Sequence, residues 1–152
     1  MENKNLEIIK EEAEKLLKLV KIEAGVEIKV DEEDVIHLSL QTEEAGIIIG
    51  YHGQTLSSLQ LLFNLIIYKK LGQWSKIIFD VGDWRERREE YLKKMALNIA
   101  QRVEANGEPV ACPYLTAAER RIIHLALQDN TKVITESQGE GENRRLFVKI
   151  KS

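Results

Sequence analysis

A Gly-x-x-Gly pair between two strongly apolar segments constrains the fold of this chain more than any other feature. Gly50 and Gly53 follow the run Ile47–Ile49 and precede a leucine-rich run from Leu56 to Ile67. Glycine lacks a Cβ atom, so the backbone can turn sharply there and approach a ligand closely. A helix starting at Gly53 would direct its free N–H groups and its positive dipole end toward that ligand. A plain turn between two helices gives the same glycine spacing, so the pair alone does not establish a binding site.

The periodicity of apolar residues predicts the elements around this glycine pair. Residues 4–22 carry apolar side chains at helical spacing, and residues 26–30 and 36–41 alternate as the two strands of a β-hairpin. Two apolar helices flank the glycine loop, and we expect the second to be a core element because it is apolar nearly all round. Residues 77–81 predict a third strand. This order of elements resembles the type II KH fold (α-β-β-α-α-β), whose Gly-x-x-Gly loop clamps nucleic-acid backbone.

A second set of elements begins after Val81, where Asp83 is the predicted N-cap of a new helix. We therefore predict a domain boundary between Gly82 and Asp83, with domains at residues 1–82 and 83–152. The second domain should contain a long helix, a shorter helix that begins with a capping box at Thr116–Glu119, and two strands at residues 133–136 and 146–150. The predicted fold class is α+β, with a small α/β domain after the KH domain.

An arginine and a histidine lie four residues apart on the shorter helix of the second domain. Arg120 and His124 therefore share a helix face, and Arg121 is adjacent to it. A guanidinium and an imidazole side by side can bind a phosphate together, the first as a permanent cation and the second as a donor that becomes cationic below neutrality. The same spacing on an arbitrary helix is more often solvated surface. Arg144 and Arg145 start the last strand, where alternation sends them to opposite faces, so only one should reach the Arg120/His124 surface.

This second constellation, a capped helix with Arg-x-x-x-His followed by two strands, resembles the R-three-H domain, which binds single-stranded nucleic acid. A type II KH module followed directly by an R-three-H module resembles the bacterial Jag family, also called SpoIIIJ-associated or KhpB/EloR-like proteins. The resemblance covers roughly residues 26–150 and is densest in residues 119–130 and 135–145. It implies cytoplasmic binding of single-stranded RNA, a role in regulating cell elongation and envelope growth, and often a small KH-domain protein as partner.

The resemblance implies two groups of nucleic-acid contacts, with single-stranded DNA as an alternative ligand. The predicted contacts are Gly50, Tyr51, His52, Gly53 and Gln54 in the glycine loop, and Arg120, Arg121, His124, Arg144 and Arg145 in the second domain. Tyr51 could stack on a base or simply cover the loop. KH loops commonly carry Lys or Arg where this chain has Tyr51 and His52, so weaker or more pH-dependent binding is expected there. Many family members also have a further N-terminal domain, for which residues 1–25 leave no room.

The charge distribution leaves a second functional class open. The net charge of −3 is unusual for a nucleic-acid binder. Residues 1–82 hold nine lysines and fourteen acids (9 − 14 = −5), whereas residues 83–152 hold thirteen basic residues, including all eight arginines, and eleven acids (13 − 11 = +2). The arginines favour phosphate binding by the second half, although surface arginines are common. The runner-up interpretation is a protein-interaction scaffold that keeps both folds and binds little RNA.

Other function classes find little support in the composition. No apolar run is long enough for a membrane span, and no signal peptide precedes the first helix, so a soluble cytoplasmic protein is expected. A single cysteine and three scattered histidines provide no metal site, and no phosphate or dinucleotide loop motif occurs. Cys112 should be a small buried filler rather than a nucleophile, and Trp74 and Trp84 should be core or interface anchors. We expect no catalytic activity, no cofactor and no metal.

Overall fold

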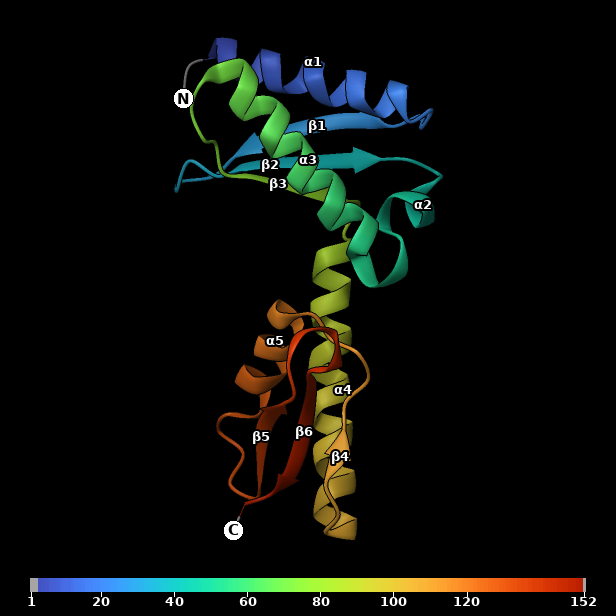
Figure 1. Ribbon diagram of the computed structural model, residues 1–152, viewed down its shortest axis with the longest axis vertical. Coiled ribbons are helices and arrows are strands. Elements are labelled where there is room, and N and C mark those ends of the chain that lie inside the picture. The colour runs from blue at the N-terminus through green and yellow to red at the C-terminus, as the bar shows by residue number, and fades with distance from the viewer. Residues whose placement is uncertain (1–2, 152) are drawn as a thin grey trace. The chain divides into compact units, whose positions relative to one another are not determined.

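The computed structural model describes residues 3–151, which form two compact units (Figure 1). The first unit ends at Arg85 and the second begins at Glu86, so the division falls near the start of a long helix. This is three residues beyond the boundary predicted at Gly82 and Asp83. Each unit has its own apolar core, and the two cores share no residue.

The first unit contains the predicted KH order of elements. These are α1 (Asn3–Leu19), β1 (Gly25–Val30), β2 (Ile36–Gln41), α2 (Ala45–Ile49), a 3-10 turn (Tyr51–Gly53), α3 (Gln54–Leu71) and β3 (Ile77–Val81). The strand order is β1-β2-β3, with β1 and β2 antiparallel and β2 and β3 parallel. The predicted α+β class and the type II KH order are therefore confirmed.

One face of this sheet is buried under α1 and α3 (Figure 1). Leu38 on the central strand lies beside Phe79 on β3, and both are fully buried. The Phe79 ring meets the Phe63 ring of α3 edge to face, with centroids 4.8 Å apart. This packing holds the N-terminus of α3, and with it the glycine loop, at a fixed place on the first unit.

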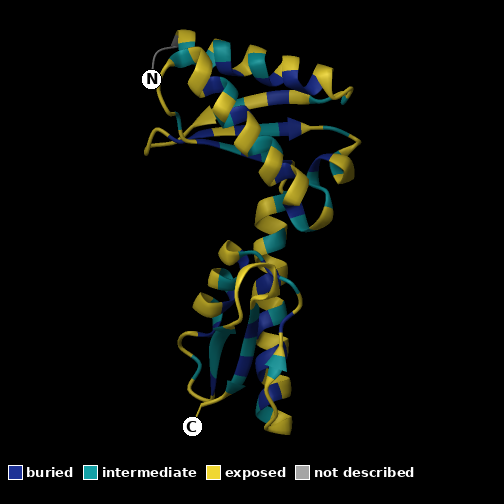
Figure 2. Ribbon diagram, in the orientation of Figure 1, coloured by how far each residue is buried: buried dark blue, intermediate teal, exposed yellow. Residues whose placement is uncertain are grey.

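The side of α3 that faces the sheet belongs to the core, as expected, but the opposite side is exposed although it is also apolar. Four large apolar residues of α3 are exposed, namely Leu61 (63%), Leu62, Leu65 and Tyr68 (Figure 2). The physical reason is that one three-stranded sheet and α1 cover only one side of the helix. Trp74, predicted to be an anchor, is also exposed (65%) and stacks on Tyr68 with centroids 4.5 Å apart. Trp84, in contrast, packs against the core of the first unit.

The second unit consists of two helices on a three-stranded antiparallel sheet. Its elements are α4 (Trp84–Asn106), β4 (Val110–Ala111), α5 (Ala117–Leu127), β5 (Val133–Gln138), a 3-10 turn (Gly141–Asn143) and β6 (Arg145–Ile150). The strand order is β4-β6-β5. Buried residues of α4 and α5, among them Leu92 and Ile123, pack with Val133, Leu146 and Val148 of the sheet. No helix among the described residues is both long enough and apolar enough to cross a membrane.

Candidate nucleic-acid interface

The N-terminus of α5 is fixed by a capping box and by a buried ion pair. Thr116 Oγ1 accepts a hydrogen bond from the backbone N–H of Glu119 (3.3 Å), and Glu119 Oε2 accepts one from the backbone N–H of Thr116 (2.8 Å), as the sequence predicts. Glu119 is only 8% exposed, and its Oε1 accepts a hydrogen bond from Arg88 Nε of α4 (2.8 Å). The same carboxylate therefore caps α5 and ties it to α4.

The outer side of α5 forms one wall of a groove that we call the arginine groove. Among the described residues, eight line it: Ala117, Arg120, Arg121 and His124 from α5, Thr135 and Ser137 from β5, Arg144 just before β6, and Leu146 from β6. None of these eight is acidic, whereas three are permanent cations. The structure thus brings four of the predicted contacts together in one concave site.

Two residues of the arginine groove are held by hydrogen bonds. Arg120 Nη1 donates to the carbonyl oxygen of Leu115 (2.8 Å), which leaves its other N–H groups available. His124 Nδ1 lies 2.6 Å from Thr135 Oγ1 and shares a hydrogen bond with it. Because this bond uses Nδ1, the Nε2 atom of His124 is the one available to a ligand.

Thr135 and Ser137 are groove residues that sequence reasoning did not single out. The antiparallel register pairs Thr135 with Val148 and Ser137 with Leu146, so both hydroxyl side chains share the sheet face that α5 covers. The available signal was the alternation along residues 133–137, which puts residues 133, 135 and 137 on one face. A hydroxyl can both donate and accept hydrogen bonds, so these two side chains suit phosphate and ribose alike.

Arg144 and Arg145 separate as alternation predicts. Arg144 lines the arginine groove, whereas Arg145 does not. The Arg145 guanidinium lies over the Tyr114 ring, with Cζ 5.3 Å from the centroid, and its Nη1 donates to the carbonyl oxygen of Glu142 (2.6 Å). Arg145 is therefore a predicted contact that the structure places outside the groove.

The glycine loop is a second candidate contact, on the first unit. Gly50 has φ of 66° and Gly53 has φ of 79°, a region that glycine adopts readily and other residues rarely. A Cβ atom at Gly50 would lie 2.0 Å from Thr55 Oγ1, and one at Gly53 would lie 3.3 Å from Trp84 Nε1. Both glycines are therefore required by the backbone of the loop, irrespective of any ligand.

Tyr51 and His52 form the tip of this loop. The Tyr51 side chain is 68% exposed, and its ring meets the His52 ring edge to face with centroids 4.1 Å apart. His52 adopts φ of 50°, an uncommon conformation for a residue other than glycine. Gln54 follows at the first position of α3 and is exposed. The loop thus presents an aromatic ring and a helix N-terminus, without a permanent cation among its own residues.

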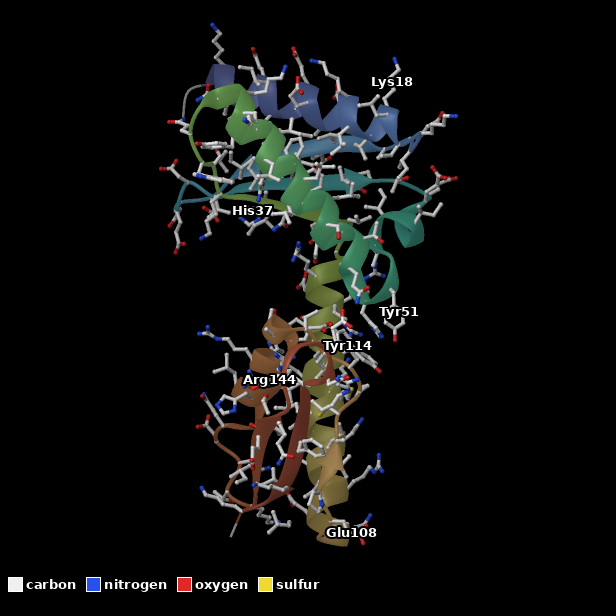
Figure 3. All side chains as sticks on the ribbon, in the orientation of Figure 1. Lys18, His37, Tyr51, Glu108, Tyr114 and Arg144 are labelled. Atoms are coloured by element: carbon white, nitrogen blue, oxygen red, sulfur yellow. The ribbon has the colours of Figure 1, made fainter. Side chains whose placement is uncertain are left out.

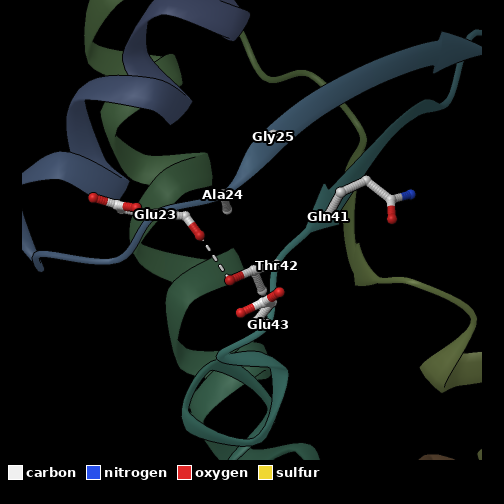
Figure 4. A pocket seen from close by; sticks show the side chains of 6 residues that line it. All are labelled: Glu23, Ala24, Gly25, Gln41, Thr42 and Glu43. Atoms are coloured by element: carbon white, nitrogen blue, oxygen red, sulfur yellow. Dashed lines mark hydrogen bonds between the residues drawn. The ribbon is translucent and has the colours of Figure 1, made fainter.

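A hollow elsewhere on the first unit is lined by acidic residues, in contrast to the arginine groove. It is lined by Glu23, Ala24, Gly25, Gln41, Thr42 and Glu43, and Thr42 Oγ1 donates to the carbonyl oxygen of Glu23 (2.7 Å) (Figure 4). Two glutamates without a basic neighbour in the lining disfavour phosphate. We therefore do not assign nucleic-acid contacts to this hollow.

The one cysteine of the chain, Cys112, lies in the core of the second unit. Cys112 is buried, and its burial raises the pKa of the thiol to about 11, which disfavours the nucleophilic thiolate. This agrees with its predicted role as a small filler of the core. Among residues 3–151 no group of three or more His, Cys, Asp or Glu is placed to hold a metal ion.

Two family models match the chain, one on each unit. The model for the KH domain of KhpA and KhpB matches residues 10–79, which include the glycine loop. The R-three-H domain model matches residues 90–149, which include every residue of the arginine groove. The RNA-binding protein KhpB of Clostridium symbiosum is 36% identical over 130 residues, or 86% of this chain, and its name matches the KhpB of the KH-domain model. The chain belongs to the Jag family.

Two further relatives extend the likeness of this Jag-family chain to other bacteria. The KhpB proteins of Lactiplantibacillus plantarum and Bacillus subtilis are 34% and 31% identical over 75% and 80% of the chain. All three relatives are named RNA-binding proteins and none is named as an enzyme. The chain spans 58%, 35% and 59% of the lengths of the C. symbiosum, L. plantarum and B. subtilis proteins.

Proposed function

We propose that this chain binds single-stranded RNA and that the arginine groove is its principal phosphate site. The observation that carries the proposal is the convergence of Arg120, Arg121, Arg144 and His124 on one concave surface without an acidic residue in its lining. Guanidinium groups bind phosphate oxygens with paired N–H donors, and an imidazole adds another donor. The names of the relatives, which describe RNA-binding proteins, also support RNA as the ligand.

Salt dependence tests the arginine groove one residue at a time. Fluorescence anisotropy of a labelled twelve-nucleotide RNA should give an affinity that falls with salt by roughly 0.7 log units per phosphate contact per tenfold salt. Arg144→Ala should weaken binding and reduce that slope by about one contact. Arg102→Ala is the matched control, because Arg102 is exposed on α4 and does not line the groove. Equal losses from both substitutions would show that only overall charge matters and would contradict the assignment.

The same assay separates RNA from single-stranded DNA. The groove recognises phosphate, which both ligands have, whereas the Thr135 and Ser137 hydroxyls can also contact the ribose 2′-OH. We expect RNA to bind more tightly than DNA of the same sequence. Equal affinities for RNA and DNA would show that the groove recognises phosphate and not the ribose 2′-OH. The ligand would then be single-stranded nucleic acid in general.

We propose the glycine loop as a weaker, second RNA contact. A phosphate could be bound by backbone N–H groups at the N-terminus of α3, and a base could stack on Tyr51. Tyr51→Ala should weaken RNA binding, whereas Tyr51→Phe, which keeps the ring, should not. Unchanged affinity in Tyr51→Ala would make the loop a structural turn only.

The exposed apolar side of α3 supports a protein partner, which we propose to be a small KH-domain protein. Leu61, Leu65 and Tyr68 recur at helical spacing, and such a stripe is uncommon on a surface without a partner. Leu61→Glu should abolish a complex with the small KH-domain protein of the same organism in sedimentation analysis. Leu19→Glu is the control, because Leu19 is exposed on α1, outside the stripe. If the chain forms this complex but does not bind RNA, the result would favour the scaffold interpretation.

Membership of the Jag family also supports a physiological proposal. We propose that RNA binding by this chain serves cytoplasmic post-transcriptional regulation of cell elongation and envelope growth. Cells that carry Arg120→Ala/His124→Ala in the chromosomal gene should then differ in length from cells with the wild-type gene. Normal length in cells with this variant would separate RNA binding from elongation.

A further inference from the structure

The sheet of the second unit has one covered face and one face without a helix. The covered face bears Leu146 and Val148, which belong to the core formed with α4 and α5. Phe147 of β6 and Ile134 of β5 alternate with core residues and so point to the other side. Both are half-buried, and neither belongs to the core residues or to the apolar residues that pack against them.

Phe147 lies at the centre of this second face. Its neighbours across the sheet are Glu136 on β5 and Ala111 on β4. Ala111 is exposed and small, and Phe147 is half-buried, so part of the Phe147 side chain is accessible. An aromatic ring on the central strand of an open sheet is an arrangement on which unpaired bases can stack.

Cationic side chains lie on both sides of Phe147 along β6. Arg145 is two residues before Phe147, and its guanidinium lies over the Tyr114 ring. Lys149 is two residues after Phe147 and forms an ion pair with Glu136. We call the surface formed by Tyr114, Arg145, Phe147 and Lys149 the open sheet face.

We propose that the open sheet face stacks bases of the same RNA strand whose phosphates occupy the arginine groove. The two surfaces lie on opposite faces of the sheet, and both reach the start of β6, because Arg144 lines the groove and the next residue, Arg145, belongs to the open sheet face. Figure 3 shows Arg144 and Tyr114 at the same end of the second unit. The proposal rests on the proposed function and adds an aromatic contact that the Arg-x-x-x-His helix does not include.

A base fits this surface better than a protein partner does. A stable protein interface buries on the order of 1,000 Å² or more, and the open sheet face offers one open ring between charged side chains. One ring is enough for one base, and a stacked base typically contributes about 5- to 150-fold in affinity. Arg145 can contact a phosphate next to that base, whereas Lys149 is paired with Glu136.

Phe147→Leu is the test, because leucine keeps an apolar side chain on the strand and removes the aromatic ring. It should weaken binding of a twelve-nucleotide RNA to the full chain by about 5- to 150-fold in fluorescence anisotropy. It should leave binding of inorganic phosphate by the groove unchanged in an NMR titration, since phosphate has no base that could stack on Phe147. Ile134→Leu, on the same face but at the edge strand, should change neither affinity.

Phe147→Trp provides an independent readout. It should keep the affinity of the wild-type protein, and RNA should quench tryptophan emission beyond the change that Trp74 and Trp84 give in the wild-type protein. Wild-type affinity of Phe147→Leu for the RNA, or an equal loss of affinity for the RNA and for inorganic phosphate, would overturn the proposal and leave the arginine groove intact as a proposal. No RNA binding by the wild-type protein would overturn both.

Discussion

At the scale of single residues, Gly50 illustrates how a motif residue can be essential without touching a ligand. Its positive φ and the close approach of Thr55 Oγ1 require glycine at this position. The glycine spacing predicted a sharp turn, but the clash with Thr55 could not be predicted, because it depends on the first turn of α3. Aspartate at Gly50 and Gly53 would disturb the loop itself, so Tyr51 is the better position for testing RNA contact.

Gly50→Ala should therefore destabilise the first unit. We expect the free energy of unfolding in urea to fall by about 1–3 kcal/mol, because alanine disfavours this φ and meets Thr55. Gly46→Ala is the matched control, since Gly46 lies in α2 and a Cβ atom added there would meet no atom within 4 Å. Alanine there should be neutral or stabilise by up to about 1 kcal/mol. Equal stability of Gly50→Ala and the wild-type protein would contradict the steric argument.

Cys112 gives a pH-dependent prediction at the same scale. Its pKa is raised to about 11 in the folded protein by burial, above the value of about 8.5 in an unfolded chain. The thiol therefore contributes stability that is present below about pH 8.5 and is lost as the pH rises toward 11. A thiol reagent at about pH 8 should react slowly with the native protein and rapidly in urea. Rapid reaction of the native protein would show that Cys112 is accessible.

At the scale of elements, Glu119 joins two helices through one carboxylate. Glu119→Ala removes the half of the capping box in which the carboxylate accepts from the Thr116 N–H, and it leaves Arg88 without this partner in a largely buried position. We expect the free energy of unfolding to fall by about 2–4 kcal/mol. Glu89→Ala breaks the exposed Glu89–Lys93 pair of α4 and should change stability by less than about 1 kcal/mol. Similar losses in the two variants in urea unfolding would refute the structural role of Glu119.

Elements differ in how far the sequence predicts them. The capping box at Thr116 and the hairpin at residues 25–41 were predictable, because local side chains and alternation determine them. The exposed side of α3 was not, because apolar composition does not reveal how many neighbours a helix will have. Thr135 was overlooked for a similar reason, since its place in the groove depends on the pairing of β5 with β6.

At the scale of the whole molecule, the two units differ in charge and in their candidate contacts. The acidic first half carries the glycine loop, and the loop itself contains no lysine or arginine. The second half carries all eight arginines and the arginine groove. The charge asymmetry was evident in the sequence and points to the second unit as the main source of phosphate affinity. Alternation predicted that only one of Arg144 and Arg145 reaches the groove, but the structure was required to identify it as Arg144.

The most direct test compares RNA binding by the wild-type protein and by Arg120→Ala/His124→Ala across a salt series. The matched control is Arg102→Ala/His37→Ala, which removes the same residue types from exposed positions outside the groove. Fluorescence anisotropy should give salt-sensitive binding by the wild-type protein and the control, and a loss of at least about tenfold in the groove variant. Equal affinities for all three proteins, or binding that does not respond to salt, would contradict the arginine groove as the phosphate site.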